Sequence, residues 1–290
     1  MLPTDSVGCL GRRDFIGLAA VGATTALAAK PGTAFAASGM QWRPDGTNLP
    51  RLGLLVAAHD WNPEIEIAAM NDGQANIFAS RMPIRFTREV LSDFTHADAA
   101  ADLLTRLNAG AVLYTSTSTG YFLGPEREEA FKKRLEGRMG GIPIATAAMA
   151  LVEALKTLNV RRIALVHPPW FGDEQHEVGR AYFQARGFDV VSALRVTPAR
   201  TLSEVSAQEV YRWVLTNTPP KAEAVVQGGG GLRMIGAIDA LEQALSRPVI
   251  TANQAALWHG LGLAGGRARI VNYGRLFGSR SSTHRILPAA

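Results

Sequence analysis

The sequence predicts an α/β protein of two pseudo-symmetric lobes, each a mostly parallel four-stranded sheet flanked by helices, with the site in the cleft between them. From residue 52 onward, short apolar runs alternate with helix-period segments, which is typical of parallel βαβ units. The chain also repeats itself. Arg51 to Ala58 matches Arg162 to His167, and Gly141 to Leu158 matches Arg247 to Leu263, at separations of roughly 105 to 115 positions.

The expected elements follow from these apolar runs and periodic segments. Strands are predicted at 52–58, 77–80, 111–114, 142–145, 163–167, 189–193, 222–227 and 249–251. Helices are predicted at 93–108, 126–138, 147–158, 176–186, 207–217, 234–245 and 254–263. We assign residues 48–145 and 252–277 to the first lobe and 146–251 to the second, with a lead-in at 37–47 and a flexible tail at 278–290.

Residues 1–36 have the features of an export signal. Arg12 and Arg13 begin a twin-arginine pattern, a weakly apolar stretch follows at 16–29, and the A-F-A at 34–36 fits a cleavage site. Lys30 interrupts the apolar stretch well short of the roughly 20 residues that a membrane span needs. We therefore expect a chain exported by the twin-arginine (Tat) pathway, periplasmic or secreted, with no membrane attachment after cleavage.

Composition limits the chemistry further. Of 290 residues, 47% are hydrophobic and 19% charged, which indicates a globular chain, and the net charge of +5 comes from scattered basic residues rather than a nucleic-acid-binding patch. The single cysteine, Cys9, precedes the expected cleavage site, so the mature chain would contain no thiol. No cofactor and no metal are expected, because no phosphate-binding, dinucleotide or metal-ligand spacing is present. A homo-oligomer is compatible with the sequence.

Two polar runs follow equivalent predicted strands. Residues 114–122 read Y-T-S-T-S-T-G-Y-F, and the strand ending at Gln227 continues into four glycines. Hydroxyl and backbone N–H donors on two facing loops would suit a small carboxylic acid, which is the expected partner. The alternative is an ordinary Ser/Thr-rich turn that caps a helix. The predicted binding residues are Ser116, Ser118, Thr119, Gly120, Tyr121, Trp170, Gly228, Gly229, Gly230, Gly231 and Asn253.

Candidate acids and bases follow the first strand of each half. His59 and Asp60 end one strand and His167 ends the other, so a proton could be exchanged near neutral pH. The alternative is that both histidines are strand-end residues satisfied by backbone carbonyls. Thr117 could serve as a nucleophile beside a histidine, although no G-x-S-x-G motif supports hydrolysis.

Five segments together resemble the aspartate/glutamate racemase superfamily, within it the branch of maleate cis-trans isomerases and arylmalonate decarboxylases. The resemblance spans about residues 51–277. The segments are V-R-R-I-A-L-V (160–166), S-A-Q-E-V-Y (206–211), G-L-R (231–233), R-P-V-I-T-A-N-Q-A-A-L-W (247–258) and Y-G-R-L-F (273–277).

The resemblance implies two like lobes closing over a small carboxylate, with cysteines on the two equivalent loops acting on the substrate carbon. The family loops resemble A-C-T-S-G-S-F and S-C-T-N-L-R, which places Thr117 and Gly229 where the thiols would be. The family asparagine after the first strand falls on Asp60, and the family tyrosine of the second half on Pro169 or Trp170. Both nucleophiles are absent, so a two-thiol racemisation is excluded.

Three hypotheses remain from the sequence. The first is an exported, cysteine-independent lyase, decarboxylase or isomerase acting on a small carboxylic acid. The second is a periplasmic carboxylate-binding protein without catalysis. The third is a hydrolase that uses a serine or threonine hydroxyl.

Overall fold

The computed structural model describes residues 46–85, 87–198, 201, 204–266, 268 and 270–279. The predicted export signal, most of the lead-in and the tail from residue 280 lie outside this part of the chain. Within the described residues, no helix combines the length and the apolar character that crossing a membrane requires.

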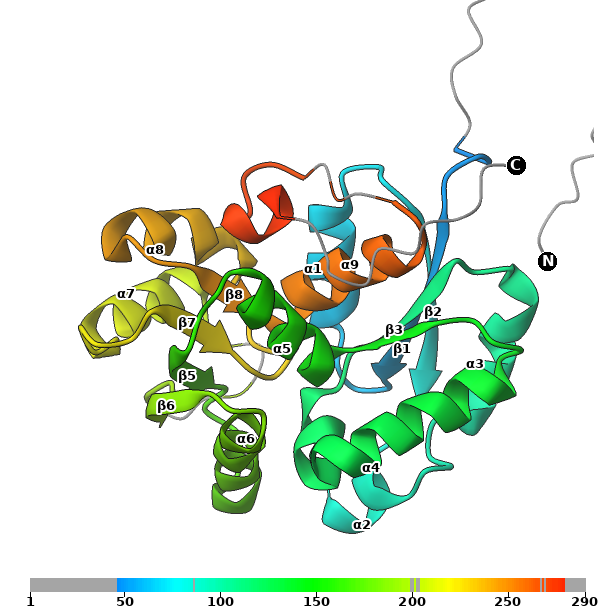
Figure 1. Ribbon diagram of the computed structural model, residues 1–290, viewed down its shortest axis with the longest axis horizontal. Helices are drawn as coiled ribbons and strands as arrows, with labels where there is room; N and C mark the ends of the chain where they lie inside the picture. Colours follow the sequence, from blue (N-terminus) through cyan, green and yellow to red (C-terminus); the bar gives the residue numbers. More distant parts are fainter. Residues whose placement is uncertain are drawn as a thin grey trace, which may run out of the picture. The chain divides into compact units, whose positions relative to one another are not determined.

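Two parallel four-stranded sheets form the framework of the fold (Figure 1). The first has the order β2-β1-β3-β4, and the second has the order β6-β5-β7-β8. All neighbouring strands are parallel. This confirms the predicted fold class. The strands are β1 (Arg51–Ala57), β2 (Asn76–Met82), β3 (Ala111–Tyr114), β4 (Ile144–Thr146), β5 (Arg162–His167), β6 (Asp189–Arg195), β7 (Ala224–Gln227) and β8 (Val249–Thr251).

The two sheets repeat each other in register as well as in order. Leu52 pairs with Ala111 at the start of the β1–β3 contact, and Ile163 pairs with Ala224 at the start of the β5–β7 contact. Val112 and Val225 therefore occupy equivalent places, one residue further along. The carboxyl ends of β3 and β7, where open α/β sheets bind ligands, are equivalent positions in the two halves.

Helices cover both sheets, and α5 and α9 lie between them (Figure 1). The helix α9 contacts β3, β4 and β8, so it packs against strands of both sheets. The helices are α1 (Asn62–Asn71), α2 (Arg88–Ser92), α3 (Asp98–Leu104), α4 (Thr117–Arg138), α5 (Ala147–Thr157), α6 (Asp173–Ala185), α7 (Ala207–Asn217), α8 (Ile238–Leu245) and α9 (Ala252–Leu263). Short 3₁₀ turns occupy Thr105–Leu107, Ile235–Ala237 and Arg275–Gly278.

One continuous hydrophobic cluster joins the two halves. It includes Leu54 of β1, Leu151 of α5, Leu165 of β5 and Leu257 of α9, all essentially inaccessible to solvent. Burying a leucine side chain contributes about 1.5–3 kcal/mol, so a shared core of this kind holds the lobes together strongly.

The structure corrects the predicted helices in the first half. The helix α1, which begins at Asn62, was not predicted; Pro63 occupies its first turn, where proline is tolerated. The helix predicted at 93–108 begins later in the structure, as α3 at Asp98–Leu104 followed by the 3₁₀ turn at Thr105–Leu107, and the separate helix α2 at Arg88–Ser92 precedes it. Asp93 accepts hydrogen bonds from the backbone and side chain of Thr95, and this turn separates α2 from α3.

The second correction concerns the hydroxyl run. Residues 117–123 are the first turns of α4 rather than a loop, and Ser116 is the N-cap, its Oγ accepting the Thr119 N–H at 3.3 Å. The helix is kinked at Gly124 (φ 71°, ψ 171°), so only the part after Pro125 corresponds to the predicted helix. The capping alternative is therefore the correct description of the local structure.

Candidate functional site

A cavity lies where the carboxyl ends of β3 and β7 meet. Its volume is about 30 Å³, which is room for one or two water molecules at about 10–15 Å³ each. The lining comes from both halves of the chain: Asp60, Thr115, Ser116, Thr117, Ser118, Pro168, Trp170, Phe171, Gly229, Gly230 and Gly231. Trp170 and Phe171 also line an adjoining outer recess of about 450 Å³.

The hydroxyl run and the glycine run are in direct contact. Thr117 Oγ1 accepts the Gly229 N–H at 3.0 Å, across 112 residues of sequence. Ser118 Oγ accepts a hydrogen bond from Gln175 Nε2 at 2.6 Å, which joins the start of α4 to α6. The sequence prediction brought these two runs together, and they do meet at one cavity.

Three glycines of the run, at 228, 229 and 230, are packed too closely for any side chain. A Cβ on Gly229, which has φ of 93°, would lie 2.6 Å from Pro168 Cγ, and one on Gly230 would lie 2.8 Å from Asn253 Oδ1. Among the described residues, the hydrogen bonds found use the N–H groups of Gly228 and Gly229 but not those of Gly230 and Gly231. The last two can therefore serve as donors to an anion in the cavity.

Strand register corrects the assignment of equivalent residues in the two runs. The N–H of Thr115 donates to the β1 carbonyl of Leu55 at 3.1 Å, as that of Gly228 donates to the β5 carbonyl of Val166 at 3.0 Å. The next residues, Ser116 and Gly229, are therefore counterparts. The resemblance to the two family loops instead placed Thr117 and Gly229 at the equivalent positions.

Asp60 is the acidic group of the cavity. It is half-buried, and desolvation raises its pKa to about 6, although the N–H of Asn62 donates to Oδ1 at 3.3 Å and the positive charges of His59 and Arg81 act in the opposite direction. A carboxyl with this pKa can hold a proton near neutral pH more readily than an ordinary aspartate.

Behind the glycine run lies a buried carboxyl that sequence reasoning missed. Glu66 Oε1 accepts the N–H groups of Met234 and Ile235 at 2.9 and 3.3 Å, and Oε2 accepts Asn253 Nδ2 at 2.7 Å. Burial raises the pKa of Glu66 to about 6 despite these donors. Asn253 Nδ2 also donates to the Gly230 carbonyl at 2.8 Å, so Glu66 positions this glycine through Asn253.

Sequence reasoning also missed Asn62, which lies on the same helix, α1, as Glu66. Its Nδ2 donates to the same Gly230 carbonyl at 2.8 Å. Asn253 was predicted as a binding residue, but it lies behind the glycine run and does not line the cavity. The segment N-P-E-I-E at 62–66 was a usable signal for a helix start with two acidic residues, but it could not show which carboxyl is buried.

His167 does not face the cavity. It is completely buried, its Nδ1 lies 2.9 Å from Nδ1 of His176, and its Nε2 has no hydrogen-bond partner among the described residues. Desolvation is the main cause that lowers the pKa of His167 to about 3, and the charges of His176 and Arg195 act in the same direction, so the ring is neutral near pH 7. The expectation that His167 faces His59 and Asp60 is wrong, because by register His167 corresponds to Val56 inside β1.

The other predicted residues divide between surface and interior. His59 is exposed and does not line the cavity, whereas Trp170 lines it and is 37% exposed. Thr119, Gly120, Tyr121 and Gly228 are buried behind the lining. The Tyr121 hydroxyl has no partner in the described part of the chain, and its ring centroid lies 5.7 Å from that of His167.

Metal coordination has no evident site here. The described residues contain no group of three or more His, Cys, Asp or Glu side chains arranged to hold a metal ion.

Comparison with known proteins gives one family model and several relatives. The arylmalonate decarboxylase model matches residues 87–277. An arylmalonate decarboxylase of Bordetella bronchiseptica is 26% identical over 179 residues, covering 60% of this chain and 73% of that protein. These matches agree with the branch indicated by the sequence motifs.

Solved structures share the two-lobed fold. A variant of the maleate isomerase Iso of Pseudomonas putida, solved with maleate, superposes with a TM-score of 0.72 at 20% identity, covering 79% of this chain and 97% of that one. Unliganded arylmalonate decarboxylase gives a TM-score of 0.69 at 23% identity, covering 79% of this chain and 99% of that one. At these identities the likeness shows the fold.

Proposed function

Because the chain belongs to the arylmalonate decarboxylase family, we propose that it is a cysteine-independent lyase, decarboxylase or isomerase acting on a small carboxylic acid between its two lobes. One observation carries the proposal. Hydroxyl-bearing residues at the start of α4 and glycines of the glycine run line the same cavity as Asp60, whose carboxyl has a raised pKa.

These groups suit a reaction in which negative charge develops next to a carboxylate. In a decarboxylation, the bond between the α-carbon and the departing carboxylate breaks, CO2 leaves, and the electron pair passes into the remaining carboxyl group as an enediolate. The Ser116 hydroxyl and the N–H groups of Gly230 and Gly231 would stabilise that charge. Protonated Asp60 would return a proton to the α-carbon.

The absence of thiols at both equivalent positions changes which group moves the proton. Ser116 and Gly229 occupy the two positions related by register, and neither ionises near neutral pH as a cysteine does. Asp60 is the group lining the cavity whose pKa is close to neutrality. We therefore assign Asp60 as the proton donor. The hydroxyl run and the glycine run are assigned to the binding of the negative charge.

The size of the inner cavity restricts what binds there. At about 30 Å³ it accepts little more than a carboxylate group. The body of the acid would extend into the adjoining recess of about 450 Å³, beside Phe122 and Trp170. An ionised Asp60 would repel a dianion by on the order of 1–4 kcal/mol at about 4 Å, so monocarboxylates or acids bound to protonated Asp60 are favoured.

The test combines a binding assay with a turnover screen. Calorimetry with simple monocarboxylates, malonates and maleate should detect binding to the wild-type chain, and NMR should detect CO2 loss or isomerisation of at least one of them. Gly229→Val should abolish binding, since even its first side-chain atom would lie 2.6 Å from Pro168. The matched control is Gly137→Val, at an exposed glycine with no neighbouring atom within 4 Å of a Cβ.

Binding without turnover of any of these acids would favour the carboxylate-binding protein, and hydrolysis of simple esters would favour the hydrolase. Equal binding by the Gly229→Val and Gly137→Val variants would place the site elsewhere and refute the proposal.

Export is a separate part of the proposal. It is supported by the twin arginines at 12 and 13 and the small-residue cleavage pattern at 34–36. Replacing both arginines by lysine should leave the precursor in the cytoplasm, as followed by cell fractionation. Unchanged export of the variant would refute this part without affecting the assignment of the cavity.

A further inference from the structure

Gln175 lies at the boundary between the inner cavity and the outer recess. It belongs to the first turn of α6 and lines the recess of about 450 Å³. Its Nε2 donates to Ser118 Oγ at 2.6 Å, and Ser118 lines the inner cavity from the start of α4. Gln175 therefore reaches from the second half of the chain to the place where an acid would pass from the cavity into the recess.

This hydrogen bond determines what the Ser118 hydroxyl can do. An amide nitrogen can only donate, so Ser118 accepts and keeps its own proton for another partner. The hydrogen bonds found among the described residues give that proton no acceptor. Ser118 is 4% exposed and lines the cavity, so the proton is available to a carboxylate bound there.

The other end of the Gln175 amide is the oxygen Oε1. None of the hydrogen bonds found in the described part of the chain uses it, and the side chain is half-buried in the wall of the recess. Because the amide group is planar, the bond from Nε2 to Ser118 also fixes the position of Oε1 beside it. An amide oxygen can only accept, so a ligand group that pairs with it must be a donor.

We propose that Gln175 determines specificity by selecting acids that carry a hydroxyl group on the carbon next to the bound carboxylate. The inner cavity holds little more than the carboxylate, so this carbon lies where the cavity meets the recess. Ser118 donates to the carboxylate, and Oε1 of Gln175 accepts the proton of the hydroxyl. The inference rests on the proposed function, because it takes the cavity as a carboxylate site.

An ammonium group is a donor too, but the recess offers it no free carboxylate. It carries a full charge and three N–H donors, which a single amide oxygen does not satisfy. Glu174 Oε1 already accepts from Arg88 Nε at 2.7 Å. Glu89 accepts from its own N–H and from Thr87, which lowers its pKa. Since Asp60 is assigned as a protonated acid, a neutral hydroxyl matches the site better.

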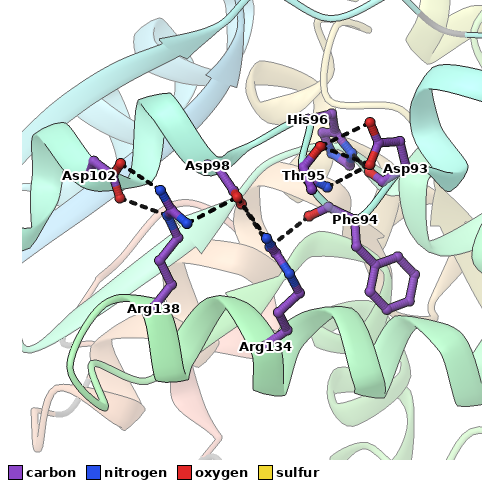
Figure 2. Close-up of polar contacts among 8 residues, drawn as sticks. All are labelled: Asp93, Phe94, Thr95, His96, Asp98, Asp102, Arg134 and Arg138. Carbon is purple, nitrogen blue, oxygen red and sulfur yellow. Dashed lines mark hydrogen bonds and ion pairs between the residues drawn. The ribbon is translucent and has the colours of Figure 1, made fainter.

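The wall of the recess formed by α2 is fastened to the helix that carries Ser118. Arg88, in the first turn of α2, lines the recess. The turn that follows α2 is held by Arg134 of α4, which donates to the Phe94 carbonyl at 2.8 Å and to both oxygens of Asp98 at 2.7 and 2.6 Å (Figure 2). These bonds join α2 and α3 to α4, so the space in which the hydroxyl is read has a defined shape.

The experiment compares three small acids of nearly equal size, glycolate, propionate and glycine, which differ only in the group on the carbon next to the carboxylate. NMR titrations at equal ionic strength give their dissociation constants. The wild-type chain should bind glycolate about three- to tenfold more tightly than propionate, the worth of one neutral hydrogen bond, and glycine no more tightly than propionate. The side-chain Nε2 signal of Gln175, identified by its absence in Gln175→Met, should shift more with glycolate than with propionate.

Two variants separate selection from folding. Gln175→Met keeps the length of the side chain and removes both polar ends, so it should bind glycolate and propionate equally. Gln175→Glu keeps an acceptor but adds a negative charge, so it should bind both acids more weakly and still prefer glycolate. Gln184→Met is the matched control, because it makes the same substitution at an exposed position of α6 and should keep the wild-type preference.

The inference is overturned by equal binding of glycolate and propionate to the wild-type chain, by tighter binding of glycine than of glycolate, or by an unchanged preference in Gln175→Met. Loss of the preference in Gln175→Glu would also contradict the role of Oε1. A purely structural role of Gln175 would weaken both acids equally and leave their ratio unchanged. If none of the three acids binds, the proposed function fails, whereas binding without selection refutes only the role of Gln175.

Discussion

Replacing Gly228 by alanine tests how closely the two lobes pack beneath the cavity. An added Cβ would lie 2.2 Å from the Tyr121 hydroxyl oxygen and 3.1 and 3.2 Å from Cδ2 and Nε2 of His167. Gly228 does not have a positive φ, so the cost comes from the contact with Tyr121 rather than from backbone strain. Overpacking of this kind costs about 1–3 kcal/mol of unfolding free energy.

The contact predicts a specific rescue. Tyr121→Phe removes the single atom nearest the added Cβ, and because that hydroxyl has no partner among the described residues, its loss should change stability by less than about 1 kcal/mol. The two contacts left, at 3.1 and 3.2 Å, need only small shifts. The double variant should therefore recover about 1–2 kcal/mol relative to the value expected if the two substitutions acted independently.

Urea unfolding followed by circular dichroism measures all four members of this cycle. Gly137→Ala serves as the control, since it adds a Cβ in open space on α4 and should be neutral or slightly stabilising. If Gly228→Ala destabilised the wild-type and Tyr121→Phe backgrounds equally, the cost could not come from the Tyr121 hydroxyl. The described packing of the glycine run against α4 would then be wrong.

Two further predictions concern the buried and half-buried carboxyls. Because the pKa of Glu66 is raised to about 6 in the folded chain, its contribution to stability is complete below about pH 4.5 and is lost as the pH rises through 6. This contribution is worth about 2 kcal/mol. Glu66→Gln should remove that part of the pH dependence between pH 4.5 and 7 in urea unfolding, and an unchanged slope would contradict the assignment. Asp60→Asn should strengthen binding of the malonate dianion above pH 6 by on the order of tenfold in calorimetry, since it removes a like charge. It should also abolish any turnover that needs the Asp60 proton, and weaker malonate binding would show that Asp60 does not face the ligand.

The fold was predictable from the sequence because it depends on patterns that recur along the chain. The matched segments beginning at Arg51 and Arg162 start β1 and β5, which occupy the same position in the two sheets. The apolar runs before Ser116 and Gly228 became β3 and β7, beside those central strands. Parallel strands joined by helices bring their carboxyl ends to one edge, so a meeting of the two polar runs could be expected without coordinates.

The local structure of those runs was less predictable. Ser116 followed by threonines and serines is compatible with a loop and with an N-capped helix, since both satisfy the same backbone donors. The choice depended on packing, because Gly120 allows the start of α4 to approach Ala148 of α5, where a Cβ would lie 2.7 Å from the Ala148 side chain. Such a contact joins residues that are far apart in sequence, and no local pattern reports it.

By itself, the sequence determined the two-lobed class, the family, the missing thiols and the meeting of the hydroxyl and glycine runs. Only the tertiary structure decided that Ser116 is the counterpart of Gly229, that His167 is buried and neutral, and that Glu66 and Asn62 support the glycine run. The physical reason is that strand and helix patterns are local, whereas burial and hydrogen-bond distances depend on which distant segments pack together, and these set the pKa values.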